Sequence, residues 1–111
     1  MAENKTVWHK VCNVEELEMD DVTGITVAGK IYAVYYLSSG YYATSGLCTH
    51  EQAKLFDGYV DGEIIECPKH NARFNIITGK AVKRPACIDL ETYPAKVEEG
   101  KIWIGLVQDS E

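Results

Sequence analysis

Two cysteines and two histidines lie close together in the sequence, between residues 48 and 70. They form two short motifs, "CTH" at 48–50 and "CPKH" at 67–70. Thiolates and imidazoles are ligands that transition metals prefer, so these side chains indicate a metal centre. The candidate metal ligands are Cys48, His50, Cys67 and His70.

The arrangement of the two motifs bears on which metal they would bind. Zinc accepts two cysteines and two histidines, but zinc fingers group cysteine with cysteine and histidine with histidine. Here each motif supplies one cysteine and one histidine. That split suits a two-iron cluster in which one iron takes both thiolates and the other both imidazoles. A zinc-stabilised interaction module remains the alternative.

The rest of the chain is typical of short β-strands separated by turns. The candidate strands are rich in Val, Ile, Tyr and Trp and are bounded by Gly and Asp. They are residues 6–11, 24–28, 30–37, 40–44, 63–67, 93–98 and 101–106. Only residues 13–21 suggest a helix, with Asn13 as its candidate N-cap. The pattern predicts an all-β fold, either an antiparallel β-sandwich or a small barrel.

One turn connects the two motifs. Asp61-Gly62 is a strong hairpin signal, because both residues tolerate the positive φ that tight turns require. A hairpin there would bring the loops 48–55 and 67–72 side by side, so that the four candidate ligands converge. We therefore expect a single domain, residues 1–111. In it a cluster-binding subdomain of two loops and a hairpin, about 46–87, is inserted in a base of 1–45 and 88–111.

Composition excludes several classes of function. The 111 residues fit one domain. A formal net charge of −6 argues against nucleic acid as a partner, since phosphates attract basic surfaces. The longest apolar run, 31–37, is too short to span a membrane. Without an apparent export signal we expect a cytoplasmic protein, in which cysteines are ligands or buried thiols rather than disulfides.

With these motifs, the chain resembles the Rieske-type [2Fe–2S] ferredoxins over nearly its whole length. "RFNIITG" at 73–79 and "RPA" at 84–86 support the resemblance. It implies one Rieske-type [2Fe–2S] cluster held by the four candidate ligands, with both histidines at an exposed tip. It also implies that Pro85 covers the cluster.

The resemblance also implies a function. Proteins of this kind are ferredoxin components of bacterial multicomponent aromatic-ring-hydroxylating oxygenase systems. They carry single electrons from a flavin-dependent NAD(P)H reductase to a terminal oxygenase. The chain is too short to hold a mononuclear-iron domain and lacks a glycine-rich nicotinamide-binding motif, so we expect a carrier rather than an enzyme. A monomer suits a shuttle that exposes one tip to two partners in turn.

A second function is compatible with the same resemblance. The small Rieske-like subunits of assimilatory nitrite reductases share the fold. Those subunits commonly lack the cluster ligands, whereas all four are present in this chain. This favours the electron carrier.

Residues near the motifs predict the reduction potential. High-potential relatives carry an extra cysteine in each cluster loop, joined as a disulfide, at positions that match Ala53 and Lys69 here. The same relatives place Ser and Tyr hydroxyls near the cluster sulfurs, where this chain has Ala72 and Phe74. Because hydroxyl hydrogen bonds stabilise the reduced cluster, their absence predicts a potential near about −150 mV, the low end of the Rieske range.

The remaining residues of similar type have ordinary structural explanations. His9 is expected at a surface or sheet edge, Cys12 is expected to pack as a small hydrophobe, and Cys87 is expected to be an inert buried thiol. Several tyrosines alternate along the candidate strands, which indicates packing rather than a path for electrons. They are Tyr32, Tyr35, Tyr36, Tyr41 and Tyr42.

Overall fold

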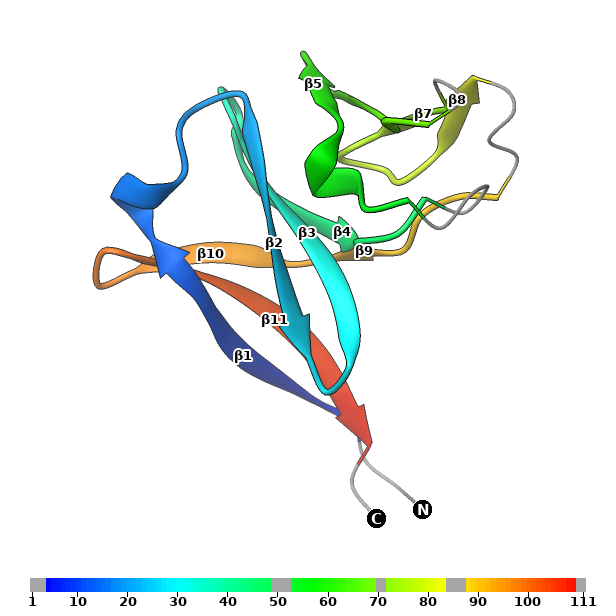
Figure 1. Ribbon diagram of the computed structural model, residues 1–111. Coiled ribbons are helices and arrows are strands. Elements are labelled where there is room, and N and C mark those ends of the chain that lie inside the picture. Colours follow the sequence, from blue (N-terminus) through cyan, green and yellow to red (C-terminus); the bar gives the residue numbers. More distant parts are fainter. Residues whose placement is uncertain (1–3, 49–52, 70–71, 84–87, 110–111) are drawn as a thin grey trace.

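The computed structural model describes residues 4–48, 53–69, 72–83 and 88–109. Over these ranges the chain consists of antiparallel sheets, with two single turns of 3-10 helix, η1 (Val14–Glu16) and η2 (Leu55–Asp57). The predicted all-β fold is confirmed (Figure 1). The described residues include no helix that is long and apolar enough to cross a bilayer.

Two of the three sheets form the base of the molecule. The first has the order β1-β11-β10 and the second the order β2-β3-β4-β9. Their strands are β1 (Asn4–Asn13), β2 (Asp21–Val27), β3 (Lys30–Leu37), β4 (Gly40–Ser45), β9 (Thr92–Tyr93), β10 (Ala95–Glu98) and β11 (Lys101–Asp109). Asn4 pairs with Asp109, so β1 begins where β11 ends, at the end of the base away from the third sheet (Figure 1).

The third sheet is small and has the order β5-β6-β7-β8. Its strands are β5 (Tyr59–Asp61), β6 (Ile64–Glu66), β7 (Arg73–Asn75) and β8 (Ala81–Lys83). It lies beside one end of β3 and β4 (Figure 1). The predicted strand 63–67 corresponds to β6, which the β-branched pair Ile64-Ile65 indicates. β5, β7 and β8 were not among the predicted strands, because they are too short to show an alternating pattern and lack such a pair.

β3 separates two apolar cores. Successive side chains of a strand point to opposite faces of the sheet. Tyr32 and Val34 therefore pack into the base core with residues of β11 such as Ile102 and Ile104. The other face of β3 contributes to a second core, which also receives the third sheet and the two loops that carry the candidate ligands. This upper core comprises Ala33, Tyr35, Leu37, Cys48, Leu55, Ile65, Cys67, Ala72, Phe74, Ile76 and Leu90.

The predicted hairpin is confirmed, with its turn one residue later than expected. Asp61 pairs with Ile64, so Gly62 and Glu63 form the tip, and Gly62 has a φ of 61°. A second tight turn, Glu99-Gly100, joins β10 to β11, and both of its residues have positive φ.

The predicted helix at 13–21 is wrong beyond its first turn. Only η1 forms there, and the N–H of Asn13 donates to Oε1 of Glu16 at 2.8 Å. No residue of η1 is buried. A helix this short needs an apolar face to pack against the protein, and this acidic segment offers little more than Leu17.

Candidate metal centre

The first ligand loop follows β4. A backbone hydrogen bond joins the two ends of this loop, at Cys48 and Ala53, and we call this closed base the neck of the loop. The N–H of Gly46 donates to the carbonyl of Ile31 at 2.9 Å, and a side chain at position 46 would collide with the Ile31 backbone. Leu47 then bridges to Lys54, and the N–H of Cys48 donates to the carbonyl of Ala53 at 2.8 Å. The loop that begins at Cys48 is therefore closed at its base.

The second ligand loop connects β6 to β7 and closes in the same way. The N–H of Cys67 donates to the carbonyl of Ala72 at 2.7 Å, again five residues along the chain. The N–H of Lys69 points at the Cys67 sulfur, 3.5 Å away. Hydrogen bonds to the sulfurs are among the factors that set the potential of iron–sulfur clusters. The two loops have equal length and matching necks.

Both cysteines lie in the upper core. Cys48 is 1% exposed and Cys67 is fully buried, and apolar side chains including Leu55, Ile65 and Phe74 share that core. Two buried sulfurs at the necks of matched loops fit a metal that prefers thiolates and is shielded from water. The described residues contain no group of three or more His, Cys, Asp and Glu side chains close enough to hold a metal.

Several predicted residues lie outside the described ranges. These are the two candidate histidine ligands, the proline of the segment 84–86 (called the proline loop below) and the cysteine that follows it: His50, His70, Pro85 and Cys87. The positions predicted to affect the potential do lie in the structure. Ala53 is half-buried and Lys69 exposed, while Ala72 and Phe74 are fully buried in the upper core. Cys12 packs against the base core, as predicted.

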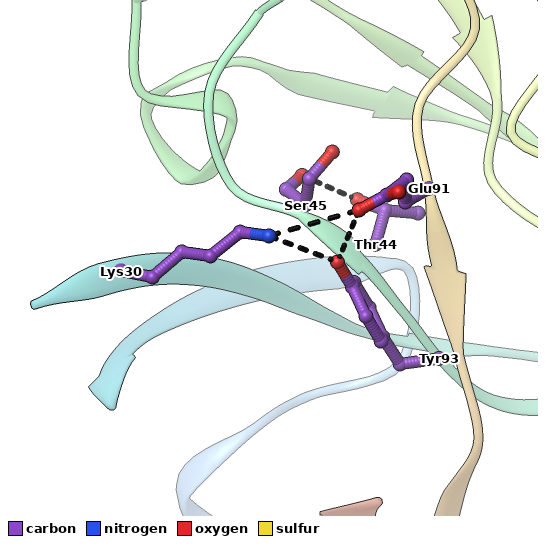
Figure 2. Close-up of polar contacts among 5 residues, drawn as sticks. All are labelled: Lys30, Thr44, Ser45, Glu91 and Tyr93. Carbon is purple, nitrogen blue, oxygen red and sulfur yellow. Dashed lines mark hydrogen bonds and ion pairs between the residues drawn. The ribbon is translucent and has the colours of Figure 1, made fainter. Parts of the chain in front are cut away.

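A polar cluster, formed by Lys30, Ser45, Glu91 and Tyr93, holds the strand that leads into the first loop (Figure 2). Nζ of Lys30 lies 3.4 Å from the Tyr93 hydroxyl and 3.6 Å from Oε1 of Glu91. Tyr93 donates to the same carboxylate at 2.8 Å, and the N–H of Ser45 donates to the Glu91 carbonyl at 2.9 Å. The hydrogen bond with Tyr93 raises the pKa of Lys30 above its usual value.

A buried hydrogen-bonded pair lies next to this cluster. The Tyr35 hydroxyl is 2.8 Å from Oγ1 of Thr44, and both side chains are fully buried. Thr44 donates to the Ser45 carbonyl at 2.8 Å, which leaves the phenol as the donor to Thr44. Burial raises the pKa of Tyr35 well above its usual value, so the phenol stays neutral. The pair joins the upper core to the strand that precedes Cys48.

The structural role of Asp89, which follows the proline loop, was not predicted from the sequence. The carboxylate of Asp89 accepts a hydrogen bond from the N–H of Ala81 at 2.9 Å. The N–H of Leu90 donates to the carbonyl of Gly79 at 2.7 Å. These contacts bring the chain on both sides of the loop together. The signal available in the sequence was an aspartate shortly after a proline-containing loop, a residue that often bonds to backbone N–H groups.

Two buried cysteines at the necks of paired loops, above a base of two sheets, are what a thiolate-ligated iron–sulfur protein requires. The match to family models agrees, since the Rieske [2Fe-2S] domain model covers residues 7–94. The chain belongs to the Rieske [2Fe-2S] domain family.

Two relatives narrow the comparison. The ferredoxin component of the naphthalene 1,2-dioxygenase system of Pseudomonas putida is 41% identical over 99 residues, covering 89% of this chain and 95% of the relative. The solved complex of reduced oxygenase and oxidised ferredoxin in carbazole 1,9a-dioxygenase contains a chain with a TM-score of 0.84. That chain is 33% identical, and the match covers 90% of this chain and 94% of the other.

These matches decide between the alternatives left open by the sequence. The family binds one Rieske-type [2Fe–2S] cluster, so the cofactor is iron–sulfur rather than zinc. The protein is a one-electron carrier rather than an enzyme. A solved structure described as an NADH-dependent nitrite reductase small subunit from Mycobacterium tuberculosis has a TM-score of 0.83. It is only 22% identical, with coverage of 94% and 98%, and shows a shared fold alone.

Proposed function

We propose that the cluster is held by Cys48 and Cys67 on one iron and by His50 and His70 on the other. The observation that carries the cysteine half of this assignment is the matched pair of loops, and the histidines are assigned from the two sequence motifs. Each begins with a buried cysteine of the upper core, and each closes by a hydrogen bond from that cysteine to an alanine carbonyl. When bound, the cluster supplies reversible one-electron transfer.

The protein's own residues supply the surroundings of that cluster. Buried apolar side chains of the upper core exclude water from the cysteine side. The Lys69 N–H favours the more negative reduced state by its dipole, 3.5 Å from the Cys67 sulfur. We propose that residues 46–87 form a cluster-binding subdomain in a base of 1–45 and 88–111, within a single domain.

The partners follow from the relatives. Electrons enter from a flavin-dependent NAD(P)H reductase and leave for a terminal aromatic-ring-hydroxylating oxygenase. Two findings support the oxygenase as partner: the relative from a naphthalene dioxygenase system and the neighbour solved together with its oxygenase. The reductase is proposed from the family resemblance alone. We propose a cytoplasmic monomer, since a shuttle alternates one exposed tip between two larger partners.

Substitution of the candidate ligands tests the assignment. The anaerobically purified protein is expected to contain two irons and two sulfides, and to give a Rieske-type EPR signal when reduced with dithionite. H50A, H70A, C48S and C67S should each abolish that signal. His9 and Cys12, both on β1, provide matched controls, and H9A and C12S should retain it.

Reconstitution tests the pairing. A naphthalene-type reductase, this protein and the terminal oxygenase are mixed with NADH, dioxygen and naphthalene. The mixture should form the dihydrodiol of naphthalene, and omission of this protein should stop turnover. Iron-free protein, or a Rieske signal that persists in H50A or H70A, would overturn the ligand assignment. A loaded cluster that supports no oxygenase turnover would overturn the pairing alone.

A further inference from the structure

A side-chain ion pair closes the second ligand loop next to its backbone neck. Glu66 is the last residue of β6 and Arg73 the first of β7, and the two are directly opposite in the antiparallel register. Nη2 of Arg73 lies 2.7 Å from Oε1 of Glu66, and Nε donates to the same oxygen at 2.9 Å. The next rung toward the loop is the hydrogen bond from Cys67 to Ala72.

This ion pair is shielded more than an ordinary surface pair. The Glu66 side chain is 21% exposed and that of Arg73 36%. The pair formed by Lys96 and Glu98 on β10 also has a short contact, 3.0 Å, but its side chains are 38% and 60% exposed. Because solvent screens exposed charges, the Glu66–Arg73 pair is screened less than the pair on β10, so loss of either partner would leave a charge that acts more strongly on its surroundings.

The position of the pair places two opposite charges beside a candidate thiolate. Glu66 precedes Cys67 in the chain, and Arg73 follows the loop. Strand alternation directs Cys67 and Phe74 into the upper core and the ion pair to the other face of the sheet. A carboxylate so close to the cluster would oppose the added electron, and a guanidinium would favour it.

We propose that Glu66 and Arg73 form a charge-compensated clamp on the second ligand loop, in which Arg73 cancels the effect of the Glu66 carboxylate on the reduction potential. The inference rests on the proposed ligand role of Cys67. Both residues are positioning residues, since they act on the cluster through the loop and through space.

Opposite charge changes provide the test. Voltammetry should show a higher potential for E66Q, which leaves the guanidinium uncompensated, and a lower one for R73M, which leaves the carboxylate uncompensated. The double variant E66Q/R73M should return toward the parent value. R73K keeps the positive charge without the guanidinium geometry, and its potential should stay closer to the parent than that of R73M.

A purely structural role predicts a different result, because loosening the loop from either side would move both single variants in the same direction. Raising the ionic strength should narrow the gap between E66Q and R73M, since both side chains are partly exposed. K96M and E98Q, which break the pair on β10, are the matched controls and should leave the potential unchanged.

Iron and sulfide are measured in every variant before the potentials are compared. Potentials of E66Q and R73M that are equal, or that shift in the same direction with the cluster retained, overturn the clamp. If R73M fails to fold, E66Q and R73K still decide the question: the clamp requires E66Q to raise the potential and R73K to stay near the parent. A parent protein without iron and sulfide would instead overturn the proposed function.

Discussion

The ring of Phe56 lies against Gly24, in the space that a side chain at position 24 would occupy. Gly24 belongs to β2 in the base, and Phe56 belongs to η2, directly after the first ligand loop. The contact therefore joins the base to the segment that carries Cys48. Its geometry depends on the missing side chain, because a methyl group there would overlap the ring.

Substitution of Gly24 by alanine tests this contact. G24A should lower the free energy of unfolding by about 1–3 kcal/mol, since the ring of Phe56 must move to make room. Urea denaturation monitored by circular dichroism measures the loss. In the double variant G24A/F56A the overlap is gone, so its stability should equal that of F56A. Additive losses in the double variant would show that the two residues do not interact.

The β2–β3 turn contains a residue in an unfavourable conformation. Ala28 and Gly29 connect Val27 to Lys30, with φ values of 51° and 82°. Asparagine tolerates positive φ better than alanine, and Asn-Gly is a preferred pair for such turns. A28N should therefore raise the free energy of unfolding by about 0.5–1 kcal/mol. E99N places asparagine at the corresponding positive-φ position of the β10–β11 turn and should also raise the free energy of unfolding. A decrease in the free energy of unfolding in both variants would contradict the explanation.

Tyr35 should make the protein sensitive to alkali. Its pKa is raised by burial, whereas the same phenol in the unfolded chain ionises around the ordinary value of 10.0. Above that pH the unfolded state binds fewer protons than the folded state, so stability falls as pH rises through the window above 10. Y35F should cost about 1 kcal/mol at neutral pH, through the lost hydrogen bond to Thr44, and flatten the alkaline decline.

Urea midpoints between pH 8 and pH 11 measure this effect. Tyr59, which is 68% exposed on β5, provides the control. Y59F should change neither the urea midpoint at neutral pH nor the fall of that midpoint with rising pH. Tyr93, whose pKa is also raised by burial, contributes to the decline that remains in Y35F. An unchanged slope in Y35F would show that the buried phenol is not responsible.

The reduction potential of the cluster should lie at the low end of the Rieske range, near about −150 mV. The side chains of Ala72 and Phe74 in the upper core carry no hydroxyl that could stabilise the reduced cluster by a hydrogen bond. A72S should raise the potential, by roughly 40 mV if the new hydrogen bond favours the reduced state by about 1 kcal/mol. A43S introduces the same hydroxyl at an equally buried position of the base core and should leave the potential unchanged. Voltammetry that gives a clearly positive potential for the unmodified protein would contradict the prediction.

Most of the fold could be predicted from the sequence, because the long strands show clear patterns of apolar residues. Residues 30–37 and 101–106 form β3 and β11 as predicted, since apolar side chains recur along them. The short strands β7 and β8 were not found. Strands of three residues acquire their conformation from their neighbours in the sheet rather than from their own composition.

The cysteines of the candidate site could be predicted, but their supports could not. The motifs identify Cys48 and Cys67 because residue type and spacing are visible in one dimension. Glu66 and Arg73 meet only once the register of β6 and β7 is known. Gly24 on β2 and Phe56 in η2 are far apart in the sequence and meet only in the folded chain. Such pairings depend on tertiary structure, which a single sequence does not display.

The pairing of Asn4 with Asp109 has a practical consequence for building devices from this molecule. A linker that joins β1 at Asn4 or β11 at Asp109 would leave from the far end of the base, away from the third sheet (Figure 1). An electrode tether or a covalent fusion at that end would leave the third sheet and the proposed ligand loops unobstructed. Both ends offer the same orientation, so two different attachments can be made without turning the loops toward the support.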